Sequence, residues 1–179
     1  MPKINFIYFI LIPLILVFAA PRVQAAGASL MFSPSSESFV MGDKILVEVR
    51  VDTGLSPINA VEATIYFPVD NLEVLNISKN EAVFTLWPQD AVFDNLNGTI
   101  SFAGGLPHPG FNDPENLITI EFKAKKEGVV NLTFDKAQIL ADDGQGTDIL
   151  AYLQAAKYVI FQEIVFPQIF SPTHPQEND

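Results

Sequence analysis

Three carboxylates stand close together in residues 141–148, which read Ala-Asp-Asp-Gly-Gln-Gly-Thr-Asp. Asp142, Asp143 and Asp148 offer the oxygen ligands that a hard cation such as Ca²⁺ takes. The segment lacks the twelve-residue spacing and the bidentate Glu of an EF-hand loop. Asp and Gly are also the residues that cap tight turns and accept positive φ. A calcium loop and a turn without any cofactor both remain open, and the missing EF-hand spacing favours the turn.

Nothing in the chain forms a set of catalytic residues. There is no Gly-x-Ser-x-Gly segment of a serine hydrolase. The two histidines, His108 and His174, lie in Pro-rich surroundings far apart, and the absence of cysteine excludes thiol catalysis and disulfides. A glycosidase needs two facing carboxylates, but acids such as Glu48 and Glu121 alternate with apolar residues, as on a solvated strand face. The sequence therefore predicts a protein that is not an enzyme.

A binding surface is the remaining kind of site. Trp87 and Tyr66 have flat side chains that stack on sugar rings, and Glu62 and Arg50 lie on the polar side of predicted strands. These four residues are the candidate ligand contacts. A single Trp is few for a polysaccharide platform, and most of the 15 Phe are needed for the core. Core packing is therefore the competing interpretation of the aromatic residues.

Charge narrows the classes of partner. The 179 residues carry 10 Lys and Arg against 21 Asp and Glu, a formal net charge of −11. Nucleic-acid binding needs clustered basic residues, so the balance argues against it. It also disfavours docking on anionic lipid. With 49% hydrophobic residues, the chain is long enough to fold around a core of its own.

The elements that must position these residues are strands, because residues 28–162 alternate with period two. In 45–52, Ile and Val at odd positions alternate with Leu, Glu, Arg and Asp at even ones, and 61–67, 118–124 and 130–135 repeat the pattern. The phase slips near Val74–Leu75, which indicates a β-bulge or a strand buried on both faces. Asn97-Gly98 predicts a two-residue hairpin turn with positive φ at both positions. An all-β sandwich follows, with a short helix at 82–86 or 150–156 left open.

The two ends differ from the middle. Lys3, an apolar run from Phe6 to Ala20 and the small residues around Ala25 predict a secretory signal peptide over 1–25. An uncleaved N-terminal anchor is the alternative, although the run falls short of about 20 residues. We predict one domain over 26–163 and a Pro-containing tail over 164–179. The apolar stretch 158–170 is too short and too interrupted for a C-terminal membrane anchor.

The order of several segments resembles a cohesin domain, the module of cellulosome scaffoldins that holds dockerins. These segments are Ala28–Leu30, Met41–Lys44 with 45–51, Ile58–Ala63, Leu72–Val74, Asn97–Ile100 with Gly104–Pro107, Leu117–Ala124 before Gly128, and Leu140–Thr147. The resemblance implies a nine-stranded jelly-roll sandwich without catalysis, similar also to some carbohydrate-binding modules. It further implies that one sheet face binds a dockerin in secreted polysaccharide-degrading assemblies.

We therefore expect a secreted, non-catalytic recognition module for a dockerin-type or other protein partner, in an extracellular or cell-surface assembly. Polar positions on the outer strands, including Glu48, Arg50, Glu62, Thr64 and Tyr66, are expected to supply the interface. Direct polysaccharide binding is one alternative, and it requires an exposed aromatic strip that includes Trp87. A structural or adhesive envelope protein, held by its N-terminus, is another.

Overall fold

The computed structural model describes residues 27–164, all of whose regular elements are strands. The predicted signal peptide over 1–25 and residues 165–179 of the predicted tail lie outside this range. The eleven strands are β1 (Ala28–Ser33), β2 (Ser36–Val40), β3 (Lys44–Asp52), β4 (Ile58–Tyr66), β5 (Leu72–Ser78), β6 (Leu86–Asp94), β7 (Thr99–Gly105), β8 (Glu115–Ala124), β9 (Gly128–Ala141), β10 (Leu150–Gln154) and β11 (Ala156–Phe161).

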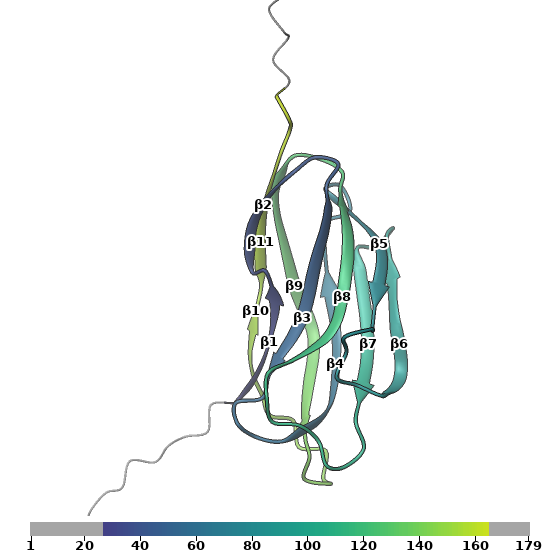
Figure 1. The fold of residues 1–179 in the computed structure, drawn as a ribbon, viewed down its shortest axis with the longest axis vertical. Coiled ribbons are helices and arrows are strands. Elements are labelled where there is room, and N and C mark those ends of the chain that lie inside the picture. The colour runs from purple at the N-terminus through teal and green to yellow at the C-terminus, as the bar shows by residue number, and fades with distance from the viewer. Residues whose placement is uncertain (1–26, 165–179) are drawn as a thin grey trace, which may run out of the picture.

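The strands form two sheets packed face to face (Figure 1). One sheet has the order β10-β1-β3-β8-β5 and the other has the order β2-β11-β9-β4-β7-β6. This arrangement confirms the predicted all-β sandwich. There are eleven strands rather than nine because the chain changes sheet at both ends: β1 pairs with β10 in the first sheet, and β2 pairs with β11 in the second, both in parallel. Pro34-Ser35 and Ala155 interrupt what would otherwise be two long strands.

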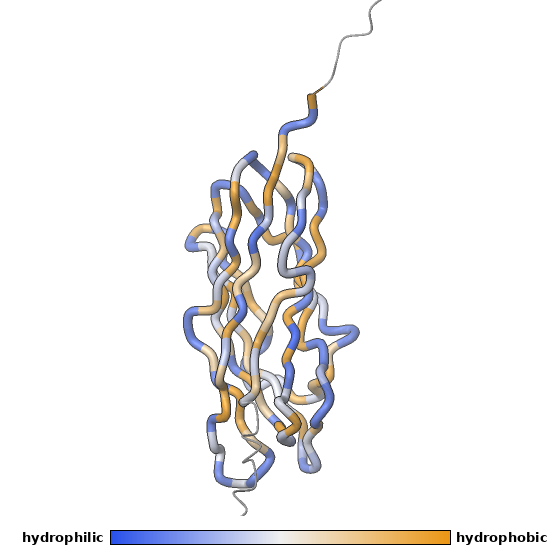
Figure 2. The backbone as a smooth tube through the Cα atoms, turned by 90° about the vertical axis from the view of Figure 1, so that its left-hand side faces the viewer, coloured by the Kyte–Doolittle hydropathy of each residue, from blue (hydrophilic) through white to orange (hydrophobic). Residues whose placement is uncertain are grey.

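The core lies between the sheets and takes one face of each strand. Ile45, Val47, Val49 and Val51 are at most 1% exposed, which confirms the period-two prediction for β3. The same holds for the inward residues of β4 and β8, and Figure 2 shows apolar and polar positions alternating along many strands. In β9 the alternation shifts, because β9 has one extra residue opposite β4 between Phe134 and Ala137. Bulges of this kind change which side chains face the core.

The predicted bulge in β5 is confirmed, and the predicted two-residue turn after β6 is wrong. The register of β5 against β8 shifts between Val74 and Asn76, which confirms the bulge. The two-residue turn at Asn97-Gly98 is wrong: residues 95–98 form a four-residue connection, and Gly98 has a φ of 68° while Asn97 keeps a negative φ. The Asp94 carboxylate accepts hydrogen bonds from the backbone N–H groups of Leu96 and Asn97 and so caps the longer loop.

The sequence allowed a short helix at 82–86 or at 150–156, and the structure has a helix at neither place. Residues 150–154 are strand β10, and residues 82–85 are irregular before β6 begins. Residues 27–164 contain no helix that is both long enough and apolar enough to span a membrane.

Asn95 joins the two sheets where their edges meet. It follows β6, the edge of one sheet, and its amide oxygen accepts from the Val74 N–H of β5, the edge of the other, at 2.8 Å. Its amide nitrogen donates to the Val74 carbonyl at 2.9 Å. The side chain thus pairs with β5 as a strand backbone would.

We expect Asn95→Ala to lower the free energy of unfolding by about 2 kcal/mol, because it leaves both partly buried Val74 groups without a partner. Urea unfolding followed by Trp87 fluorescence measures the change. Asn131→Ala, at an exposed position of β9, is the control and should stay within about 0.5 kcal/mol of the wild type. Equal effects of the two substitutions would contradict the bridging role of Asn95.

Candidate functional site

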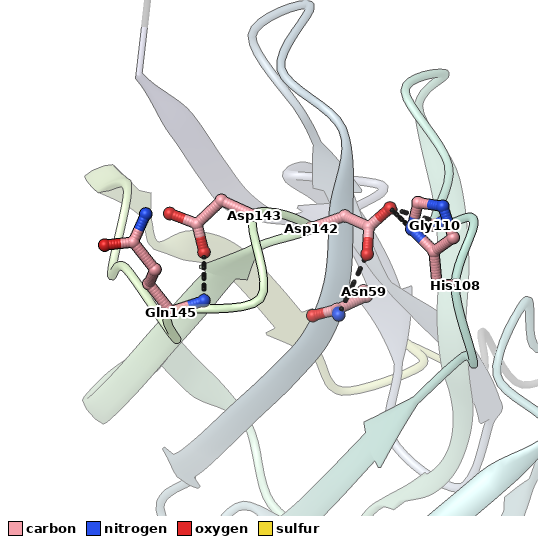
Figure 3. A network of polar contacts seen from close by, with 6 residues as sticks. All are labelled: Asn59, His108, Gly110, Asp142, Asp143 and Gln145. Carbon is pink, nitrogen blue, oxygen red and sulfur yellow. Dashed lines mark hydrogen bonds and ion pairs between the residues drawn. The ribbon is translucent and has the colours of Figure 1, made fainter.

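Asp142 is the centre of a polar network that ties three segments together (Figure 3). Its side chain is 7% exposed. One carboxylate oxygen accepts from the Gly110 N–H at 3.0 Å and lies 2.8 Å from His108 Nδ1, and the other accepts from Asn59 Nδ2 at 3.2 Å. The Gly110 hydrogen bond and, to a lesser extent, the His108 contact hold the pKa of Asp142 below its ordinary value, against the opposing effect of burial. The arrangement anchors the β7–β8 connection to the start of β4.

The other two carboxylates of the acidic loop have different partners. Asp143 accepts from the Gln145 N–H at 2.8 Å and from the Thr147 hydroxyl. Asp148 accepts from the N–H groups of Ile139 and Leu150, both at 3.1 Å. Asp142 and Asp143 point in different directions (Figure 3). Within residues 27–164, no three His, Asp or Glu side chains come together in an arrangement that would hold a metal ion.

These contacts are those of a turn held by its own hydrogen bonds, so we expect calcium not to stabilise the protein. A calcium site at a hundredfold excess of metal over its dissociation constant would add about 2.7 kcal/mol to the free energy of unfolding. Thermal unfolding with calcium and with chelator measures the difference, which we expect to be zero. If calcium raised the midpoint temperature of unfolding and Asp143→Asn abolished that rise, this expectation would be wrong and the loop would be a calcium site.

The structure separates the four candidate ligand contacts. Arg50 lies on the outer face of the five-stranded sheet, where its guanidinium donates to Glu48 at 3.0 Å. Glu62 and Tyr66 lie on β4, on the outer face of the other sheet. Trp87 is partly buried and packs edge-on against Phe84 with ring centroids 5.9 Å apart, while Lys79 Nζ sits 4.8 Å from its ring centroid. Arg50 and Glu62 therefore belong to opposite surfaces, and Trp87 supports the core.

Strand register shows which side chains surround Glu62. Directly opposite residues of neighbouring strands share a face. Glu62 is paired with Ala103 of β7 and Gln138 of β9, and Ala103 in turn with Gln89 of β6. We call this outer surface of β9, β4, β7 and β6 the β4 face. Its other outward positions are Ala60, Thr64, Tyr66, Leu86, Val92, Ser101 and Leu140.

The β4 face combines exposed apolar side chains with polar ones, of which Gln89 donates to Ser101 at 2.9 Å and Glu62 has no ion-pair partner within residues 27–164. Tyr66, Leu86 and Val92 are 43%, 52% and 52% exposed. A hollow opens over the small residues Ala60 and Ala103 in the middle of the face. A second hollow lies beside β9, where Leu153 of β10 also lines it, and Glu62 and Gln138 line both. Protein interfaces likewise combine exposed aromatic and apolar residues with polar groups.

The outer face of the five-stranded sheet is composed differently. Four of its charged side chains are paired, since Lys44 Nζ lies 2.7 Å from Glu121 and Arg50 lies 3.0 Å from Glu48. Leu46 and Tyr152, at 63% and 62% exposed, are its most exposed large apolar side chains. A partner would have to break or bury these ion pairs, which costs desolvation energy. The β4 face is therefore the better candidate interface.

Sequence reasoning identified Glu62, Thr64 and Tyr66 of this face but missed Ala103, Gln138 and Leu140. For Gln138 and Leu140 the reason is the β9 bulge, which moves both residues to the outside although Leu132, at the same parity, is buried. A bulge position is not visible in the alternation of a single strand, because it depends on the partner strand.

No protein-family model matches the chain, and no curated protein matches it in sequence. Solved structures of cohesin domains match it. The OlpC cohesin of Clostridium thermocellum, solved in a complex with dockerin Doc435, gives a TM-score of 0.63 at 14% identity, over 76% of this chain and 94% of that one. A non-cellulosomal cohesin from the archaeon Archaeoglobus fulgidus gives 0.60 at 16% identity, over 76% and 92%.

The seventh ScaB type I cohesin of Pseudobacteroides cellulosolvens gives a TM-score of 0.61 at 17% identity, over 79% of this chain and 96% of that one. The chain thus has the fold of cohesin domains, as the resemblance of its ordered segments implied.

Proposed function

We propose that this protein is a non-catalytic, cohesin-like recognition module that binds a dockerin-like protein domain through the β4 face. The observation that carries the proposal is the contrast between the two outer faces. The β4 face presents exposed Tyr66, Leu86 and Val92 around Glu62, which has no ion-pair partner within residues 27–164, whereas Lys44, Glu121, Arg50 and Glu48 of the opposite face are paired among themselves. The fold shared with cohesins, one of them solved in a complex with a dockerin, supports the class of partner.

We further propose that the module works outside the cell, in a polysaccharide-degrading or cell-surface assembly. The residues that support export are those of the predicted signal peptide over 1–25. N-terminal sequencing of the exported protein distinguishes cleavage near Ala25 from an uncleaved anchor. Direct polysaccharide binding has less support, because Trp87 packs against Phe84 and does not form an exposed strip with Tyr66.

The test is a calorimetric titration of the purified protein with calcium-loaded dockerin domains encoded by the same organism. Tyr66→Ala should weaken binding by about 2 kcal/mol, roughly thirtyfold, because Tyr is enriched among the residues that dominate such interfaces. The matched control is Leu46→Ala on the opposite face, which should leave the affinity unchanged.

The outcomes separate the two parts of the proposal. If Leu46→Ala weakens binding and Tyr66→Ala does not, the interface lies on the five-stranded sheet. If none of the organism's dockerins binds, the assignment to dockerin recognition is wrong.

A further inference from the structure

Two neighbouring hollows on the β4 face differ in character. The first is lined by Glu62, Asp135 and Lys136, together with Gln138 and Leu153. The second is lined mainly by small and apolar residues, among them Ala60, Pro88, Ala103 and Leu140. Glu62 and Gln138 line both and so stand between them. We call these the acidic hollow and the apolar hollow.

The acidic hollow carries more negative than positive charge. Within residues 27–164, neither Glu62 nor Asp135 lies within ion-pair distance of a basic side chain, Lys136 included. Two carboxylates therefore face one ammonium group, on a chain whose formal net charge is −11. A carboxylate covered by a partner without a compensating charge is strongly disfavoured. A partner that covers Glu62 must therefore bring a cation to it.

The apolar hollow owes its depth to small side chains. Ala60 of β4 and Ala103 of β7 form its floor, and Pro88 and Leu140 stand beside it. Gly104 keeps the sheet close to the core here: a Cβ on Gly104 would lie 2.3 Å from the Phe84 ring. No charged group other than Glu62 lines the hollow, so it accepts an aliphatic side chain and penalises a polar one.

Building on the proposed function, we propose that Glu62 is a specificity-determining residue: the partner places a Lys or Arg against Glu62 and Asp135 and an adjacent aliphatic side chain in the apolar hollow. The two requirements are coupled, since Glu62 and Gln138 line both hollows. The recognised element is therefore a basic residue next to an aliphatic one on a single protein surface.

The probe is a display library of a small helical scaffold whose exposed positions on one helix face are randomised. The library is selected in parallel against the wild-type protein, Glu62→Gln, Glu62→Lys and the control Glu73→Lys, which lies on β5 of the opposite sheet. Selection against the wild type should enrich Lys or Arg beside Leu, Ile or Met. Glu62→Gln should abolish the enrichment of the basic residue, Glu62→Lys should replace it with Asp or Glu, and Glu73→Lys should leave it unchanged.

A second measurement quantifies the pairing. For a selected binder, exchange of its basic residue for Met should weaken binding to the wild type by about tenfold or more, and should have little effect on binding to Glu62→Gln. Circular dichroism verifies that each variant is folded.

The inference and the proposed function fail in different ways. Binders that Tyr66→Ala weakens, but whose basic residues are independent of Glu62, would overturn the specificity role and leave the β4 face as the interface. Binders that are insensitive to substitution of both Tyr66 and Glu62 would overturn the interface itself.

Discussion

Tyr158→Ala should lower the free energy of unfolding by about 4 kcal/mol, the usual cost of removing a buried aromatic ring. Tyr158 is fully buried on β11 and packs edge-on against Phe39 of β2, with ring centroids 5.5 Å apart. Its hydroxyl donates to the Pro34 carbonyl at 2.6 Å, at the point where the chain passes from β1 to β2. The side chain thus holds the crossover of the N-terminal strands against the C-terminal strand. Chemical denaturation measures the loss.

Tyr158→Phe isolates the hydroxyl and should cost about 1 kcal/mol at neutral pH. Burial, and to a lesser degree the charge of Glu37, raise the pKa of Tyr158 far above its ordinary value. A free tyrosine ionises near pH 10, so above that pH the unfolded chain releases this proton while the folded chain retains it. Stability is therefore fully present below about pH 10 and is lost as the pH rises further.

Alkaline unfolding tests this sign. The wild type should lose stability above about pH 10 more steeply than Tyr158→Phe, because the variant has no proton to release at this site. Tyr152→Phe, at an exposed position 62% accessible to solvent, is the control and should follow the wild type. If Tyr158→Phe and the wild type have parallel alkaline profiles, the folded protein does not suppress the ionisation of Tyr158.

Gly110→Ala should lower the free energy of unfolding by about 3 kcal/mol. A Cβ at this position would lie 2.1 Å from the Ile58 carbonyl oxygen and 3.2 Å from the Asp142 Cβ. The contact is with backbone, so no side-chain rotation relieves it. Gly110 donates to Asp142, and its neighbour Phe111 forms reciprocal backbone hydrogen bonds with Ile58 at 2.9 Å. Both attachments of the β7–β8 connection would be displaced together.

Gly144→Ala is the matched control in the neighbouring loop. Nothing lies within 4 Å of a Cβ there, but its φ is +70°, so its cost is that of backbone conformation alone, about 1 kcal/mol. Thermal and urea unfolding of both variants measure the difference. Hydrogen exchange of the Ile58 and Phe111 amides should accelerate in Gly110→Ala and remain slow in Gly144→Ala. Equal costs for the two substitutions would show that the close approach of Gly110 to Ile58 is not a constraint on the fold.

The alternation of side chains was sufficient to predict the sandwich, because it depends only on strand geometry and on which residues avoid water. The inward positions of β3, β4 and β8 follow from the sequence alone. The turn after Asp94 was misread because its length depends on hydrogen bonds from Leu96 and Asn97 to the Asp94 side chain, which compete with the two-residue turn that Asn-Gly favours.

The sequence predicted only part of the candidate site, because the residues that share a face depend on how the strands are paired. Polar parity places Glu62 and Tyr66 outside the core, but it cannot tell Arg50 and Glu62 apart, since both alternate with buried residues on their own strands. Only the assignment of β3 and β4 to different sheets puts Arg50 and Glu62 on opposite surfaces. The contact of Trp87 with Phe84 is likewise tertiary.

The acidic loop shows the same division most clearly. Its composition alone determined that residues 141–148 would turn sharply and carry three carboxylates. The directions of those carboxylates depend on the hydrogen-bond donors around them. The partners of Asp142 are Gly110, His108 and Asn59, which belong to other segments of the chain. These three hydrogen bonds fix the orientation of the Asp142 carboxylate and tie the loop to the β7–β8 connection and to β4. The sequence by itself thus determined the strands and the inward positions of β3, β4 and β8, because these depend on local geometry and hydrophobicity. The tertiary structure decided the β9 bulge, the turn after Asp94 and which polar groups meet, because these depend on neighbouring strands and loops.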